Sequence, residues 1–153
     1  MTADRRDPAL ETLFLPFETG PILWPNEGGA LFLRARDGWP LRQQPRPDLI
    51  CEQSFKPDAE ALQRSGWTVG DPGSMDTTVR YPLVLLLPPR QRDEARALFA
   101  QALQRCAPGG LVVACIANDE GAKSGEGDFK RLCGLDGNLT KHHCRVFWSR
   151  RED

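Results

Sequence analysis

Two continuous apolar runs dominate the second half of the chain. Residues 83–87 and 111–116 are uninterrupted apolar stretches, typical of strands buried on both faces of a parallel sheet. Between them, residues 91–107 carry apolar side chains at offsets of 3, 4, 7, 8 and 11 from Ala95, which predicts a helix with one apolar face. Pro108, Gly109 and Gly110 end that helix.

The C-terminal segment continues the same alternation. Residues 118–127 are polar and glycine-rich and predict a loop, followed by a short helix over 128–133. Residues 143–149 predict a last strand, whose apolar side chains fall on both faces. On that strand, Cys144, Val146 and Trp148 share one side.

The first half has a weaker pattern. Residues 8–15 predict a short helix with a proline in its first turn, and residues 58–65 predict a second helix. Residues 30–33 and 49–51 predict short strands, and residues 40–47, which contain three prolines, predict an irregular arm. Strands that alternate with helices at this spacing predict an α/β sheet.

Length and charge limit the function classes. With 153 residues we expect one domain, spanning 1–153. Twenty Lys and Arg against 21 Asp and Glu exclude a strongly basic nucleic-acid binder, although a local basic face stays open. The five cysteines form no CxxC pair, so we expect neither a disulfide scaffold nor a zinc site, and a cytoplasmic protein. No apolar run is long enough for a membrane span, and no secretory signal is present.

Several motifs that would carry chemistry are incomplete. Residues 117–124 resemble a phosphate loop, but alanines stand at both glycine positions. The first strand leads into Arg34-Ala-Arg-Asp-Gly rather than into a glycine-rich dinucleotide fingerprint. His142 and His143 on a strand would point to opposite faces, which argues against a shared metal. An unrecognised hydrolase site stays open.

Pro88-Pro89 follows a buried strand, at the sheet edge where α/β folds place their sites. Amine-directed methyltransferases carry a polar Asn or Asp before such a pair and an aromatic residue after it. Leu87 and Arg90 flank it here. Because leucine accepts no hydrogen bond, we expect this site to be inactive.

These segments together resemble a known family. Residues 86–96, the amphipathic helix, residues 108–113 and 118–127, and the closing Cys144-Arg-Val-Phe-Trp148 are similar to the N-terminal half of the ribosomal RNA small subunit methyltransferase C family. The resemblance is strongest over 83–149. It implies a degenerate, Rossmann-like (class I methyltransferase-like) three-layer sandwich. It also implies that the catalytic domain, with the S-adenosylmethionine loop and the Asn-Pro-Pro-aromatic motif, lies outside this chain.

The resemblance implies a non-catalytic domain of a 16S rRNA guanine-N2 methyltransferase, with the catalytic domain and small-subunit rRNA as partners. No catalytic, cofactor-binding or metal-binding residue is carried over, and we expect the chain alone to be inactive and to hold no cofactor. The candidate rRNA contacts are Lys123, Lys130, Arg131, Lys141, Arg145, Arg150 and Arg151. An ordinary solvated surface would explain these cations equally well. A purely structural partner domain without RNA contact, and an independent α/β enzyme, are the alternatives.

Overall fold

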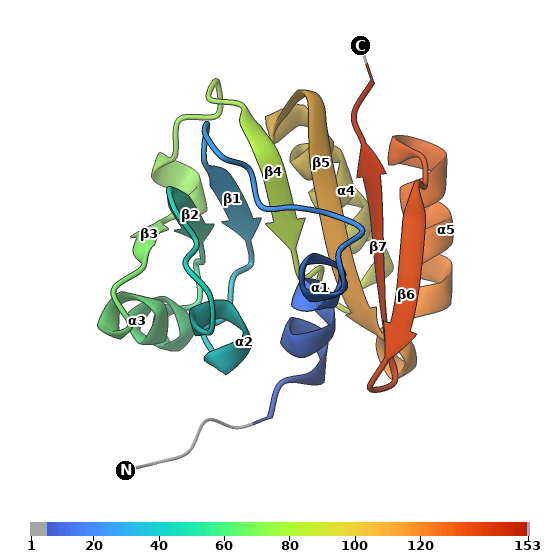
Figure 1. Ribbon diagram of the computed structural model, residues 1–153, viewed down its shortest axis with the longest axis horizontal. Coiled ribbons are helices and arrows are strands. Elements are labelled where there is room, and N and C mark those ends of the chain that lie inside the picture. Colours follow the sequence, from blue (N-terminus) through green and yellow to red (C-terminus); the bar gives the residue numbers. More distant parts are fainter. Residues whose placement is uncertain (1–5, 153) are drawn as a thin grey trace.

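A computed structural model describes residues 6–152. Its centre is a seven-stranded sheet with the order β3-β2-β1-β4-β5-β7-β6 (Figure 1). The strands are β1 (Ala30–Leu33), β2 (Leu49–Glu52), β3 (Thr68–Gly70), β4 (Tyr81–Leu86), β5 (Cys106–Ala117), β6 (Gly137–Lys141) and β7 (Cys144–Arg150). The helices are α1 (Pro8–Thr19), α2 (Trp39–Arg42), α3 (Lys56–Arg64), α4 (Arg92–Arg105) and α5 (Ala122–Cys133). Short 3₁₀ turns lie at Pro72–Ser74 and Asn118–Glu120.

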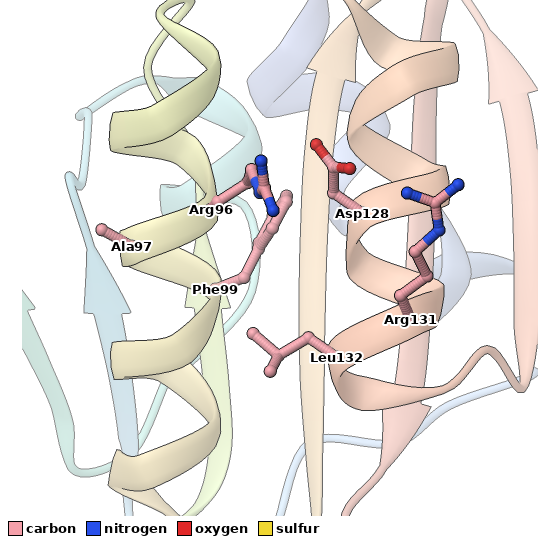
Figure 2. A pocket seen from close by; sticks show the side chains of 6 residues that line it. All are labelled: Arg96, Ala97, Phe99, Asp128, Arg131 and Leu132. Carbon is pink, nitrogen blue, oxygen red and sulfur yellow. The ribbon is translucent and has the colours of Figure 1, made fainter.

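Strands β1 to β5 are parallel, and β7 runs antiparallel to β5 and β6. Helices cover both faces: in Figure 1, α1 lies in front of the sheet and α4 and α5 lie behind it. Figure 2 shows α4 and α5 side by side on this second face. The predicted α/β class and three-layer sandwich are confirmed.

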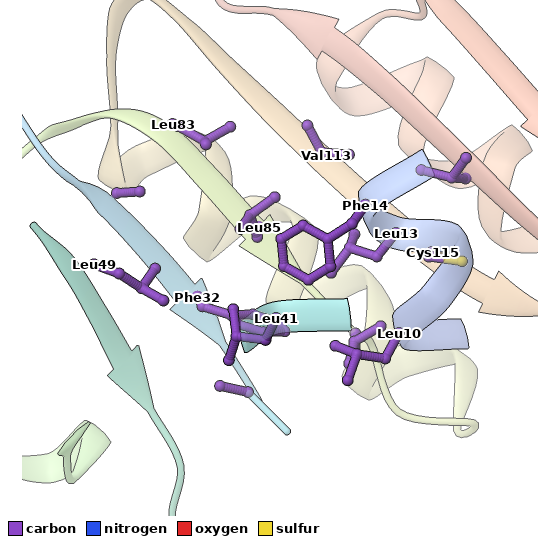
Figure 3. Packing of buried hydrophobic residues seen from close by; sticks show 14 of the residues in the cluster. Leu10, Leu13, Phe14, Phe32, Leu41, Leu49, Leu83, Leu85, Val113 and Cys115 are labelled. Atoms are coloured by element: carbon purple, nitrogen blue, oxygen red, sulfur yellow. The ribbon is translucent and has the colours of Figure 1, made fainter. Parts of the chain in front are cut away.

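Alternating side chains of the central strands build a core on each face. Phe32, Leu83 and Leu85 point to the face that Leu10, Leu13 and Phe14 of α1 cover (Figure 3). The intervening residues of the same strands point to the other face. There they meet Phe99 of α4 and Phe129 of α5, which pack edge to face at a centroid distance of 5.4 Å. Both cores therefore depend on the same strands.

Most elements lie where the sequence predicts them. The first helix extends to Thr19, and Arg105 ends α4 directly before β5, so residues 108–110 lie inside a long strand. A single turn of helix, α2, interrupts the arm predicted over 40–47. Strands β3 and β6 were not predicted.

The prediction of a loop over residues 118–127 is wrong, because α5 already begins at Ala122. Gly125 and Gly127 suggested a loop. Gly125 is required by packing instead: a Cβ there would lie 2.4 Å from Ile116 Cδ1 on the sheet beneath. Gly125 is a poor helix former, but its lack of a side chain lets α5 pack close to β5.

The placement of His142 and His143 on a strand is also wrong. Both have positive φ, 55° and 58°, and join β6 to β7 as the two central residues of a tight hairpin. Strand β6 was missed because it begins with Gly137, a residue of low strand propensity. Packing requires this glycine, since a Cβ there would lie 2.3 Å from the Trp148 ring.

Candidate functional site

The strand order reverses between β1 and β4, and this switch point is where open α/β sheets bind ligands, at the carboxyl ends of the strands. Leu33 of β1 pairs with Leu86 of β4, so the residues that follow both strands face each other across the crevice. These are Arg34 on one side and Leu87 with Pro88 on the other.

Arg34 spans this crevice. Its Nη1 donates to the backbone oxygen of Leu87 at 3.0 Å, and its backbone is left-handed, with a φ of 52°. Glycine adopts that conformation most easily, and dinucleotide-binding loops use glycine at this point. Partial burial and the positive charge of Arg36 lower the pKa of the Arg34 guanidinium.

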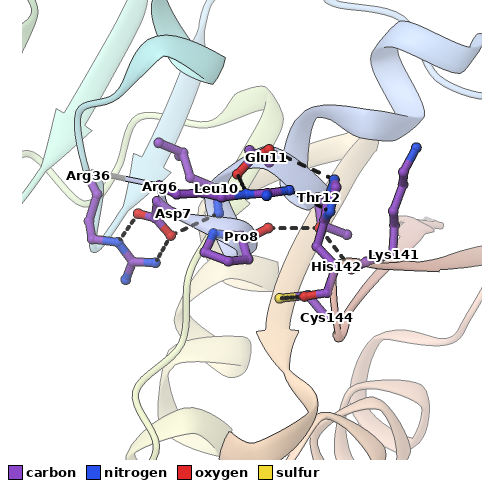
Figure 4. A network of polar contacts seen from close by, with 10 residues as sticks. All are labelled: Arg6, Asp7, Pro8, Leu10, Glu11, Thr12, Arg36, Lys141, His142 and Cys144. Atoms are coloured by element: carbon purple, nitrogen blue, oxygen red, sulfur yellow. Dashed lines mark hydrogen bonds and ion pairs between the residues drawn. The ribbon is translucent and has the colours of Figure 1, made fainter. Parts of the chain in front are cut away.

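Arg36 ties the same loop to α1. Its Nε and Nη2 donate to the two carboxylate oxygens of Asp7 at 2.7 and 2.9 Å (Figure 4). Burial disfavours the charged form of Arg36, but the hydrogen bonds and charge of Asp7 outweigh it and raise the pKa of Arg36. Asp7 also caps α1 by accepting from the Leu10 amide, so one carboxylate fixes both segments.

A second set of contacts fixes α1 to the β6–β7 hairpin. Thr12 donates to the backbone oxygen of Lys141 at 3.1 Å, and Arg6 lies 3.0 Å from His142 Nδ1 (Figure 4). Glu11 accepts from Arg6 at 3.1 Å. The start of α1 is thereby held against the carboxyl end of β5.

The carboxylate at the end of β2 is not available to a ligand in the crevice. Glu52 is 3% exposed and forms an ion pair with Arg105 Nη1 at 3.1 Å, inside the core under α4. The next residue, Gln53, donates to the Ala35 backbone oxygen at 2.7 Å and closes the β1 loop.

This chemistry does not fit S-adenosylmethionine, the cofactor of the class I methyltransferase fold. The Arg34 side chain spans the crevice to Leu87 and puts a guanidinium charge where the sulfonium group of the cofactor would lie, whereas Arg36 is paired with Asp7. A flexible glycine loop is missing, and Leu87 before Pro88-Pro89 offers no side-chain acceptor to a target amine. We derive no methyl-transfer step for this site.

The predicted rRNA contacts do not form one patch. Lys123, Lys130 and Arg131 are exposed on α5, and Lys141 is exposed at the end of β6. Arg150 and Arg151 lie at the opposite end of the sheet, because Arg150 pairs with Leu111 whereas Cys144, next to Lys141, pairs with Ala117.

Three of these arginines also have partners within the domain. Arg145 donates to Glu126 at 2.9 Å, and Arg150 to the Gly109 backbone oxygen at 2.7 Å. Arg151 donates to the backbone oxygens of Leu103 and Cys106. Each therefore stabilises the fold, and any RNA contact would come in addition.

Sequence reasoning missed the roles of Arg34, Arg36 and the buried Glu52–Arg105 pair. The signal for Arg34 and Arg36 was the Arg-Ala-Arg sequence that replaces glycines after the first strand.

Within residues 6–152, no three His, Cys, Asp or Glu side chains are grouped to hold a metal ion. Over the same residues, no helix has the length and apolarity to cross a membrane.

No protein-family model and no curated protein matches the chain. Solved structures do. The chain has 20% identity and a TM-score of 0.75 to the Thermus thermophilus (T. thermophilus) 16S rRNA N2 G1207 methyltransferase (RsmC) in complex with AdoMet and guanosine, covering 97% of this chain and 40% of that one. The chain thus spans less than half of that methyltransferase.

Two further neighbours have a similar length to this chain. The N-methyltransferase NodS from Bradyrhizobium japonicum WM9, in complex with S-adenosyl-L-homocysteine, has 14% identity, a TM-score of 0.70, and coverage of 93% and 84%. An RNA methyltransferase from Salinibacter ruber, with the same ligand, has 13% identity, a TM-score of 0.63, and coverage of 99% and 95%. These likenesses establish the class I, Rossmann-like methyltransferase fold.

Proposed function

We propose that this chain is the non-catalytic N-terminal domain of an S-adenosylmethionine-dependent 16S rRNA guanine-N2 methyltransferase. The observation that carries the proposal is a complete methyltransferase sheet whose switch point is spanned by Arg34 instead of a glycine loop. The likeness to RsmC supports it, because it extends over nearly all of this chain but 40% of that methyltransferase.

In this proposal the chain supports a separate catalytic domain and assists binding to small-subunit rRNA, in the cytoplasm. The cofactor belongs to the catalytic domain, and this chain holds none. A domain that only packs against the catalytic half, with no RNA contact, is the second candidate. The internal partners of Arg145, Arg150 and Arg151 favour that candidate, since they give these cations a structural use.

Calorimetric titration with S-adenosylmethionine and S-adenosyl-L-homocysteine tests the non-catalytic role. We expect no binding heat and no thermal stabilisation with either compound. A SAM-binding methyltransferase of the same fold, titrated in parallel, is the positive control. Micromolar binding by this chain would contradict the proposal.

Fluorescence anisotropy with small-subunit rRNA separates the two candidates. If the domain assists RNA binding, affinity falls steeply with salt and falls further in the variant Lys141→Glu. The exposed Lys141 ammonium forms no hydrogen bond or ion pair within residues 6–152. Association with the catalytic half at unchanged RNA affinity supports the packing role instead.

A further inference from the structure

A cleft of about 420 Å³ opens between α4 and α5, on the face of the sheet opposite α1. Arg96 and Ala97 line it from α4, and Asp128, Arg131 and Leu132 from α5, with the buried Phe99 ring between them (Figure 2). Its lining residues come from α4 and α5, whereas the residues of the switch point follow β1 and β4.

The cleft carries more positive charge than its one carboxylate neutralises. Arg92 engages both oxygens of Asp128, from Nε and Nη2, each at 2.9 Å. These hydrogen bonds, with further help from Arg96 and Arg131, lower the pKa of Asp128, which is therefore ionised at neutral pH.

Arg96 and Arg131 are exposed, and neither forms a hydrogen bond or ion pair with another residue of the segment 6–152. Since Arg92 already satisfies Asp128, two guanidinium charges are left without an anion. Figure 2 shows the Arg96 side chain reaching from α4 toward Asp128, while Arg131 runs along α5 on the far side of Asp128.

We propose that this cleft binds two neighbouring phosphodiester groups of single-stranded rRNA, one at Arg96 and one at Arg131, a proposal that rests on the proposed rRNA role of the domain. Guanidinium groups match phosphate oxygens in charge and geometry. Leu132, 45% exposed, and Ala97 offer a small apolar surface to the adjoining sugar. The large apolar group, Phe99, is fully buried in the domain, so little is left to anchor a protein partner.

A second cavity, of about 490 Å³, adjoins the cleft at Leu132. Arg150 and Arg151 line it, but so do the carboxylates of Asp136 and Glu152. Of the cations predicted from the sequence, the proposed site therefore uses Arg131.

The test is the affinity of the chain for a fluorescent single-stranded oligonucleotide of small-subunit rRNA, across a salt series. In Arg96→Gln/Arg131→Gln we expect roughly ten-fold weaker binding, because fewer counterions are released. The slope of log affinity against log salt should fall by about 1.4, since each phosphate contact to a single strand contributes about 0.7. Arg64→Gln/Lys56→Gln on α3, with the same charge loss on the opposite face, is the matched control and should bind as the unmodified chain does.

Unchanged circular dichroism and urea unfolding of both variants establish that they fold. Unmodified affinity in the cleft variant overturns this inference and leaves the proposed rRNA role standing. Equal weakening in the α3 control also overturns it, because general charge would then explain the binding. No RNA binding by the unmodified chain at low salt overturns the inference and the proposed rRNA role together.

Discussion

The guanidinium of Arg105 lies inside the core between α4 and β2 and is 1% exposed. One of its nitrogens pairs with Glu52, while Nε and Nη2 have no hydrogen-bond partner among the described residues. Burying charged groups costs free energy that a single contact of 3.1 Å offsets only in part. The pair therefore fixes how α4 sits on the sheet without adding much stability.

This makes two opposite predictions for substitutions at the pair. Glu52→Gln alone should lower the free energy of unfolding by about 3–5 kcal/mol, because it leaves the Arg105 charge buried and uncompensated. The double variant Glu52→Leu/Arg105→Met should have a free energy of unfolding within about 1 kcal/mol of that of the unmodified chain, or a higher one. Urea denaturation followed by circular dichroism measures both. A double variant as unstable as the single one would contradict this account.

The Arg92–Asp128 contact predicts a pH dependence. Hydrogen bonds from Arg92 lower the pKa of Asp128 below its ordinary value of 3.8, so the folded state releases this proton more readily than the unfolded state. The resulting stabilisation is complete above that ordinary value and is lost as the pH falls through the lower, folded-state pKa. Urea unfolding of the unmodified chain and of Asp128→Asn across a pH series should therefore converge in acid. A stability difference that persists at the lowest pH would contradict this origin.

At the scale of elements, helix α5 contains two glycines in different surroundings. A Cβ on Gly127 would meet no atom within 4 Å, whereas a Cβ on Gly125 would lie 2.4 Å from Ile116 Cδ1. One glycine is free to change, and the other is required by the close approach of α5 to β5.

Gly127→Ala should raise the free energy of unfolding by about 1 kcal/mol through helix propensity alone. Gly125→Ala should lower it by about 1 kcal/mol, because overpacking costs about 1–3 kcal/mol and propensity offsets about 1. Adding Ile116→Val removes the clashing Cδ1 and should relieve the Gly125→Ala cost in a double-mutant cycle. Additive single effects would show that Ile116 is not the obstacle.

The elements that sequence patterns predicted are those whose pattern comes from burial. The apolar runs that became β4 and β5 are buried on both faces, and the apolar stripe of α4 covers the sheet. The failures come from tertiary contacts. Gly125 and Gly137 are glycines because Ile116 and Trp148 occupy the space of a side chain, and no local pattern encodes those contacts.

At the scale of the whole molecule, the same distinction applies to the candidate sites. The sequence pointed to the sheet edge after β4 and to the glycines missing after β1, since both are found in the residues that directly follow a predicted strand. It did not predict that Arg34 reaches Leu87 or that Glu52 turns into the core toward Arg105, because these depend on residues far apart in the chain. The cleft between α4 and α5 likewise needs two helices placed side by side.

The shared sheet predicts that the molecule unfolds as one unit. Leu83 and Leu85 point into one core while Val84 and Leu86 of the same strand point into the other, so losing either layer exposes the strands of both. The cysteines report each side: Cys51 and Cys115 lie in the core under α1, and Cys106 lies in the core under α4. Burial raises the pKa of Cys51 to about 12, and also raises that of Cys115, which leaves these thiols unreactive in the folded chain.

Pulsed labelling with N-ethylmaleimide across a urea series, read out by peptide mass spectrometry, follows each thiol in the unmodified chain. Cys51, Cys106 and Cys115 should become labelled at one midpoint, which coincides with the loss of circular dichroism, because no layer keeps its core when the other is lost. Burial also raises the pKa of half-buried Cys133 to about 12, so this thiol should become labelled at the same midpoint. Labelling of Cys106 at lower urea than Cys115 would mean that α4 and α5 separate from the sheet first, and that the two faces are energetically independent.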